Sequence, residues 1–232
     1  MVRRRFSVKE IFDTKTIIIS GSILVALGVS YLAPVAQHSI SGSINYAAQI
    51  CPANIGTSTT QLYLPKSSLA VKEIGKRASV LSHSRQLSVG AGIKPAIVDP
   101  NSANSIAITS SKGGTAIALC SGGQDDQWFV GGSGGITSKG IVEVVNSGLS
   151  DATVDVMGYS AKSALPTNSL TIKANSDVKI ALDTLVPGQE TIALHILTRA
   201  GRTASFILDQ RSKGLNTLGA EYVNPSAQPS DH

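Results

Sequence analysis

The longest hydrophobic stretch of the chain is a run of uncharged residues at positions 17–36, which a short basic stub precedes. At about 1.5 Å of rise per residue, a helix of this length measures about 30 Å and matches the hydrocarbon core of a bilayer. The stub carries five Lys or Arg residues and two acidic ones, a bias that keeps an N-terminus in the cytoplasm. We therefore expect a single-pass cell-membrane protein whose remaining chain lies outside the cell.

A cleaved signal peptide is the alternative interpretation of this stretch, because it also has a basic start and an apolar centre. The apolar run is longer than the roughly 7–15 residues usual in a signal peptide. Pro34 also makes the sites after Ala33 and Ala36 poor ones for cleavage. We favour a retained anchor, and the choice between retention and cleavage stays open.

Beyond the anchor, hydrophobic and polar residues alternate with a period of two, which is typical of strands with one buried face. The alternating hydrophobic residues include Leu170, Ile172, Val178, Ile180, Leu182, Ile192, Leu194, Ile196, Ala204, Phe206 and Leu208. Turn signals such as Asn175-Ser176-Asp177 and Ala200-Gly201 separate these runs. Residues 68–86 fit either a helix or short strands. The pattern predicts an all-β ectodomain, an antiparallel β-sandwich of immunoglobulin-like type.

These patterns divide the chain into six segments. They are a cytoplasmic basic stub (1–16), a transmembrane helix (17–36), a linker (37–45), a first β-rich module (46–118), a second β-sandwich module (119–224) and a disordered tail (225–232). Whether the two β-rich modules form one domain or two stays open.

The net charge of +5 does not indicate a nucleic-acid-binding protein, because the basic stub contributes more than half of it. Outside the stub, 15 basic residues face 13 acidic ones. Residues 66–94 are locally basic, with six Lys or Arg and only Glu73. An anionic envelope polymer could bind there, but a solvated surface is the interpretation that we favour.

Cys51 and Cys120 are the only cysteines, and both follow the anchor. An even number of cysteines in an oxidising compartment predicts a disulfide, with two buried thiols as the alternative. Two cysteines and four scattered histidines do not have the spacing of a zinc site. We predict no metal and no cofactor.

Three motifs suggest chemistry, and each has a simpler structural explanation. The glycine run at 131–135 lacks the Gly-Lys-Ser/Thr of a phosphate loop, so we expect a turn with positive φ. Asp125 and Asp126 lack the spacing of a calcium loop and are expected in a turn before a strand. His195 lies in an alternating strand without a nearby nucleophile and is expected to be structural. We therefore predict no catalytic residues.

Trp128 is the only tryptophan and is followed by Phe129. With so few aromatic residues in the chain, we expect this pair to fill the core. If the pair is exposed, Trp128, Phe129 and Tyr159 are the candidate residues for binding a sugar or a partner.

The order of several short motifs resembles an uncharacterised actinobacterial family of membrane-anchored, exported proteins, a domain of unknown function. The motifs are Cys51-Pro52, Cys120, Trp128-Phe129-Val130-Gly131, Asn146-x-Gly148, Val154-Asp155-Val156, Leu185-x-x-Gly188, Gly201-Arg202, Asp209-x-Arg211-x-x-Gly214 and Gly219-x-x-Tyr222-Val223. The resemblance covers residues 119–223 well. Ser147 and Tyr222 depart from the family, which tends to have proline and tryptophan at these places. The resemblance implies an anchored envelope protein with a paired-cysteine β ectodomain, and it carries over no catalytic residues.

From these observations we expect a non-catalytic interaction or scaffolding module of the cell envelope, with the membrane and envelope proteins or a cell-wall polymer as partners. A cell-wall carbohydrate-binding domain that uses Trp128, Phe129 and Tyr159 is the first alternative. An envelope enzyme accessory that uses Asp125 or Asp126 is the second.

Overall fold

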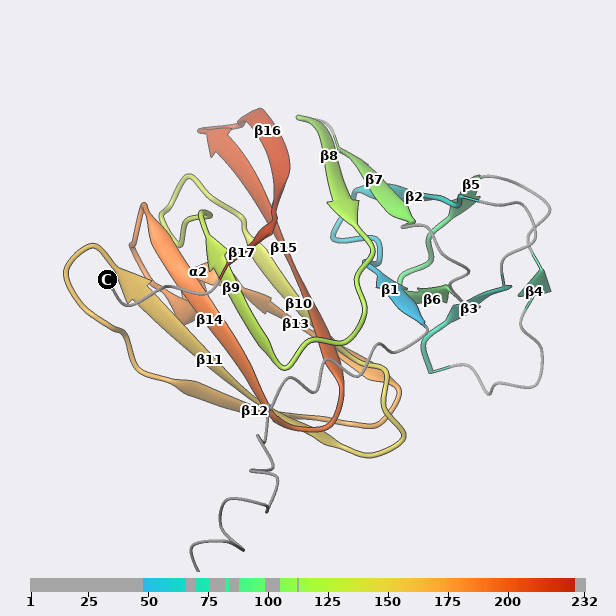
Figure 1. Ribbon diagram of the computed structural model, residues 1–232. Coiled ribbons are helices and arrows are strands. Elements are labelled where there is room, and N and C mark those ends of the chain that lie inside the picture. The colour runs from blue at the N-terminus through green and yellow to red at the C-terminus, as the bar shows by residue number, and fades with distance from the viewer. Residues whose placement is uncertain are drawn as a thin grey trace, which may run out of the picture. The chain divides into compact units, whose positions relative to one another are not determined.

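The computed structural model describes residues 48–65, 70–75, 82–83, 88–98, 105–111 and 113–227, which belong to one compact unit, Ile44–His232 (Figure 1). The predicted basic stub, transmembrane helix and linker lie outside the described residues. Within the described ranges, no helix is both long and apolar enough to span a bilayer.

The first half of the described chain forms two small antiparallel sheets. Sheet A contains, in spatial order, β1 (Gln49–Cys51), β6 (Ala96–Val98), β3 (Ala70–Glu73) and β4 (Ser82–His83). Sheet B contains β5 (Ser88–Gly90), β2 (Thr59–Tyr63), β7 (Ile106–Ser111) and β8 (Gly114–Leu119). The described parts of the ambiguous segment 68–86 are therefore strands, not a helix.

The second half forms two larger antiparallel sheets. Sheet C contains β12 (Asn168–Ile172), β11 (Ala152–Ser160), β14 (Ile192–Ala200), β9 (Asp126–Val130) and β17 (Pro225–Ser226). Sheet D contains β13 (Ser176–Ala181), β10 (Ile141–Asn146), β15 (Thr203–Lys213) and β16 (Asn216–Val223), and a single helical turn, α2 (Leu182–Leu185), follows β13. All the pairings within these sheets are antiparallel, so the predicted all-β antiparallel class is confirmed.

Two details of this half bear on the sequence predictions. Gly201 forms the predicted turn between β14 and β15 with a φ of +93°, and a Cβ there would lie 2.7 Å from the Cα of Ala152. Only glycine fits this position.

Residues 225 and 226, assigned from the sequence to a disordered tail, instead extend sheet C as β17, because their backbone pairs with Trp128 and Phe129.

Sheets C and D face each other across a hydrophobic core. This core contains Phe129, Val142, Val144, Val154, Val156, Ile172, Leu182, Leu185, Val186, Ile192, Leu194, Ile196 and Ile207. A second core lies on the opposite side of sheet D. There Val145, Ala204, Phe206, Leu208 and Tyr222 join buried residues of sheets A and B, such as Ile50, Leu62 and Val98. Strands β10 and β15 are therefore buried on both faces.

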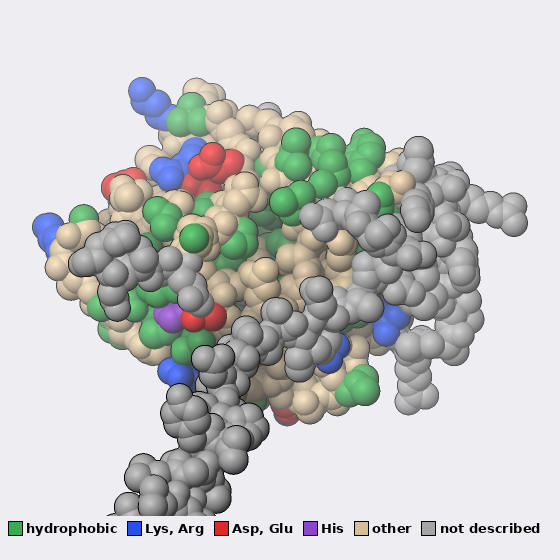
Figure 2. Space-filling view, in the orientation of Figure 1, with side chains coloured by type: hydrophobic (Ala, Val, Ile, Leu, Met, Phe, Trp, Pro, Cys, Tyr) green, Lys and Arg blue, Asp and Glu red, His purple; other side chains and the backbone are tan. Residues whose placement is uncertain are grey.

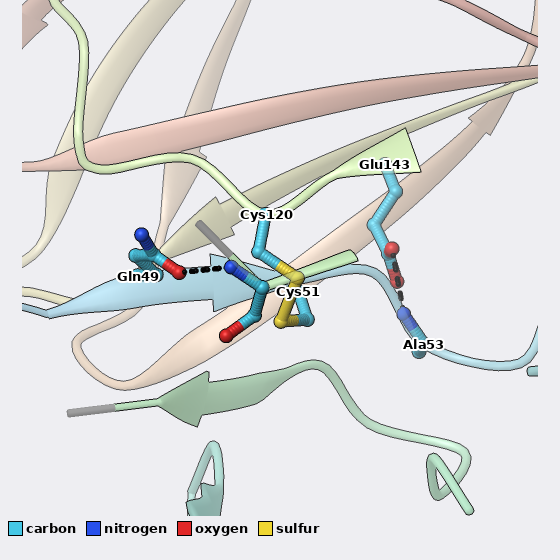
Figure 3. The surroundings of a disulfide bond; sticks show 6 residues. Gln49, Cys51, Ala53, Cys120 and Glu143 are labelled. Carbon is cyan, nitrogen blue, oxygen red and sulfur yellow. Dashed lines mark hydrogen bonds between the residues drawn. A yellow bond between two sulfur atoms is a disulfide. The ribbon is translucent and has the colours of Figure 1, made fainter. Parts of the chain in front are cut away.

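A disulfide between Cys51 and Cys120 closes the first half of the fold, as the sequence predicts (Figure 3). Both residues are buried, and the adjacent residues Ile50 and Ser121 exchange two backbone hydrogen bonds of 2.8 and 3.0 Å. The link therefore joins β1 to the segment that leaves β8. For a sequence separation of 69 between the cysteines, the chain-entropy estimate gives a stabilisation of about 4 kcal/mol.

Glu143 is a fully buried acid in the second core, on the face of β10 that meets sheets A and B. Its Oε2 accepts a 3.1 Å hydrogen bond from the backbone N–H of Ala53, two residues after the disulfide (Figure 3). The Nζ of Lys179 lies 3.1 Å from Oε1 and also donates to the carbonyl of Ile93. Burial nevertheless raises the pKa of Glu143 above its ordinary value of 4.5. Glu143 thus connects sheet D to the Ala53 segment, and its partner Lys179 connects the sheet to the Ile93 segment.

Because the pKa of Glu143 is higher in the folded state, the folded protein retains this proton to a higher pH than the unfolded chain does. The contribution of Glu143 to stability is therefore fully present below pH 4.5 and is lost as the pH rises from there through the raised pKa. Glu143→Gln cannot ionise at this position. As the pH rises, the free energy of unfolding of the wild type should therefore fall relative to this variant, by about 1.4 kcal/mol in total for each pH unit that separates the raised pKa of Glu143 from its ordinary value. Denaturant unfolding of the full chain in mild detergent from pH 4 to pH 8 measures this difference.

Glu221→Gln, at an exposed position of β16, controls for replacing a glutamate outside the core. A difference between wild type and Glu143→Gln that stays constant across the pH range would contradict the prediction.

Candidate binding site

The outer face of sheet C carries aromatic side chains on its central strands. Along β9, the inward residues Gln127 and Phe129 are 2% and 0% exposed, whereas Trp128 between them is half-buried. Successive strand residues point to opposite faces, so Trp128 lies on the side of sheet C that faces away from sheet D. His195 on β14 and Tyr159 on β11 are half-buried on the same face.

The strand register brings these side chains together. His195 is the cross-strand partner of Trp128, while Tyr159 is paired with Ala193, two residues from His195. The rings of Trp128 and His195 stack with their centroids 4.1 Å apart and their planes 10° apart. The rings of Trp128 and Tyr159 stack at 5.5 Å and 29°. We call Trp128, His195 and Tyr159 the aromatic strip.

A carboxylate holds the histidine of the aromatic strip in place. Oδ1 of Asp126 lies 2.7 Å from Nε2 of His195, and the two side chains are 36% and 13% exposed. Asp126 is two residues before Trp128 on β9, so both belong to the same face. Figure 2 shows a histidine beside an acidic side chain, with hydrophobic side chains around it. The hydrogen bond fixes the imidazole ring against the indole.

A second polar group lies on the same face of sheet C, at Asp155 of β11. Ser169 donates a 2.6 Å hydrogen bond to its Oδ1, and Nε of Arg199 donates one of 2.8 Å to Oδ2. These bonds, with Ser169 as the larger influence, lower the pKa of Asp155 below its ordinary value. Asp126 and Asp155 are both cross-strand partners of Leu197, so the two carboxylates flank one end of the strip. The face combines a rigid aromatic surface with charged hydrogen-bonding groups, as ligand sites do.

The structure separates the three residues that the sequence proposes for binding. Trp128 and Tyr159 meet on the outer face, so the expectation that Trp128 fills the core is wrong. Phe129 does not join them, because it points inward and is completely buried. His195, expected to be structural, lies beside Trp128 on this face, and Asp126, expected in a turn, is instead the first residue of β9 and is hydrogen-bonded to His195.

The other sequence motifs lie apart from this site. Gly131 and Gly132 have φ values of +132° and +84°, which confirms the predicted positive-φ turn after β9. Asp125 accepts a backbone hydrogen bond of 2.7 Å from Thr198 through its carbonyl. In the part of the chain that the structure describes, no three His, Cys, Asp or Glu residues are grouped closely enough to hold a metal ion.

The neighbours Trp128 and Phe129 offer a matched test of this assignment. Phe129→Ala should lower the free energy of unfolding by about 3–5 kcal/mol, because it leaves a cavity in the core between sheets C and D. Trp128→Ala should cost about 1 kcal/mol, because it removes stacking on a half-exposed face. Denaturant unfolding of the full chain in detergent, followed by circular dichroism, measures both. Equal losses for the two variants would contradict the placement of Trp128.

Two solved structures share a limited likeness with this fold. One, the crystal structure of Thermotoga maritima 1070, matches 46% of this chain and 96% of its own, with a TM-score of 0.40 and 10% identity. The other, the Anabaena sensory rhodopsin transducer, matches 36% of this chain and 92% of its own, with a TM-score of 0.31 and 19% identity. No curated protein matches the sequence.

A family model matches residues 96–232, which extends from β6 through all of sheets C and D. The match begins earlier than the region of residues 119–223 over which the sequence motifs resemble a family of unknown function. It covers more than half of the chain. The chain therefore belongs to the family of unknown function DUF5719.

Proposed function

We propose that this chain is a membrane-anchored, extracytoplasmic binding module of the cell envelope, with an immunoglobulin-like sandwich that binds carbohydrate without catalysis. The observation that carries the proposal is the aromatic strip on the outer face of sheet C. The basic stub and the apolar run at 17–36 support the membrane anchor and the outside location. The disulfide supports the same location, because such bonds persist in oxidising compartments.

The chemistry of the strip suits a sugar. A pyranose ring has an apolar C–H face that packs on an aromatic ring, and hydroxyl groups around its rim that need hydrogen-bond partners. Trp128 and Tyr159 supply the aromatic surface, and Asp126 and Asp155 supply acceptors at one end of it. Arg199 supplies a donor at that end.

The strip is also rigid before any ligand arrives. Trp128 is held by stacking with two rings, those of His195 and Tyr159, and His195 is held by Asp126. Little side-chain entropy is then lost on binding, which favours affinity from a small contact area. In this proposal Asp126 positions His195, in place of the enzyme-accessory role considered for it from the sequence.

Co-sedimentation of the full chain, in detergent micelles, with insoluble cell-wall polysaccharide tests the proposal. Wild-type protein should bind saturably, and Trp128→Ala and Tyr159→Ala should each weaken binding about tenfold or more, as the loss of about 1.4 kcal/mol of stacking predicts. Tyr63→Ala, at an exposed tyrosine of sheet B, is the matched control and should bind like wild type.

Binding that is equal in all four proteins would show that the aromatic strip is not the sugar site. Failure of wild-type protein to bind any wall polysaccharide would contradict the carbohydrate assignment itself.

A further inference from the structure

The outer face of sheet B exposes large apolar side chains to solvent. Tyr63, Ile117 and Leu119 are 42%, 54% and 56% exposed, and Ile106 and Ile108 between them are half-buried. The register sets Tyr63, Ile106 and Leu119 in one cross-strand row and places Ile117 beside Ile108 in a second. These five residues form what we call the apolar face. Figure 2 shows hydrophobic side chains gathered over β7 and β8.

In β7 and β8, the distribution of side-chain size is the reverse of that in a sheet with one solvated face. The inward residues of β7 and β8 are small, namely Ala107, Thr109, Ala116 and Ala118. An antiparallel sheet with one face in water normally places its polar residues outside. A contiguous exposed apolar patch is typical of a surface that meets a partner or a membrane.

The charge pattern of the sequence that forms sheet B favours a membrane with anionic lipids. The sequence has no Asp or Glu in residues 58–65, 88–98 or 105–123, which include all four strands of sheet B. The neighbouring segment, residues 66–94, carries six basic residues against Glu73, and Lys112 lies between β7 and β8. Basic residues in the segments that connect these strands would attract anionic headgroups while the apolar side chains enter the bilayer interface.

The chain between the proposed membrane anchor and β1 also keeps the β unit near lipid, a point that rests on the proposed anchor. That anchor ends at residue 36, and β1 begins at Gln49. The intervening chain can span at most about 45 Å when fully extended, so the β unit stays close to the bilayer surface. Because the connecting chain holds the β unit at a high effective concentration relative to the bilayer, even a weak contact with lipid is populated.

We propose that the apolar face docks on the surface of an anionic lipid bilayer, with Tyr63 at the headgroup level and Ile117 and Leu119 in the interface. Docking would orient the β unit relative to the membrane and leave the outer face of sheet C free for its ligand.

Photolabelling of the full chain tests this proposal. The chain is reconstituted in phosphatidylcholine vesicles with about one third phosphatidylglycerol and a photoactivatable phospholipid, and the lipid adducts are mapped by mass spectrometry. Adducts should occur at 17–36 and on peptides that contain β7 and β8. Ile117→Ser with Leu119→Ser should lower the adducts on the β7 peptide, which carries neither substitution, about tenfold and leave those at 17–36 unchanged. Ile136→Ser with Leu149→Ser, at positions 99% and 92% exposed in the other half of the fold, is the matched control.

The outcomes separate the docking from the anchor. Adducts confined to 17–36 would overturn the docking and leave the anchor intact, whereas their absence from 17–36 would contradict the anchor. A change from dimer to monomer on Ile117→Ser with Leu119→Ser, measured by sedimentation in detergent, would assign the face to a second copy and overturn the docking. Retention of the disulfide and of the Trp128 emission spectrum shows that each variant is folded.

Discussion

The fold depends on the burial of both faces of sheet D. Val142 and Val144 of β10 enter the core shared with sheet C, while Glu143 and Val145, which alternate with them, enter the core shared with sheets A and B. Without sheets A and B, this second face of sheet D would expose large apolar side chains to water, such as Phe206 and Leu208 of β15. The first half of the chain is therefore part of the structural core, and the burial of Glu143 follows from the same packing.

Buried hydrogen bonds fix the contact that sheet D makes with the first half. Thr109 of β7 is hydrogen-bonded to both Thr60, at 2.8 Å, and the hydroxyl of Tyr222 on β16, at 3.0 Å. Burial raises the pKa of Tyr222, so its hydroxyl remains protonated and available as a donor. With the inner faces engaged in this way, the outer faces of sheets B and C are the surfaces that can meet other molecules. The two proposals place a ligand on each of them.

The sequence predicts the features that depend on neighbours along the chain. Alternation identifies the strands β12, β13, β14 and β15, the even cysteine count identifies the disulfide, and Gly131 and Gly201 mark turns that need positive φ. The aromatic strip could not be predicted in this way, because it depends on the register between β9, β11 and β14. Alternation within β9 separates Trp128 from Phe129, but it does not say which of the two points inward.

Native-state hydrogen exchange of the full chain in detergent, at increasing denaturant, tests the shared burial of sheet D most directly. Amides of β2 and β7 should exchange through the same cooperative opening as those of β10 and β15, with equal opening free energies and equal dependence on denaturant. If β2 and β7 instead open at lower denaturant while β10 and β15 keep their full protection, the two halves fold separately and the account is contradicted.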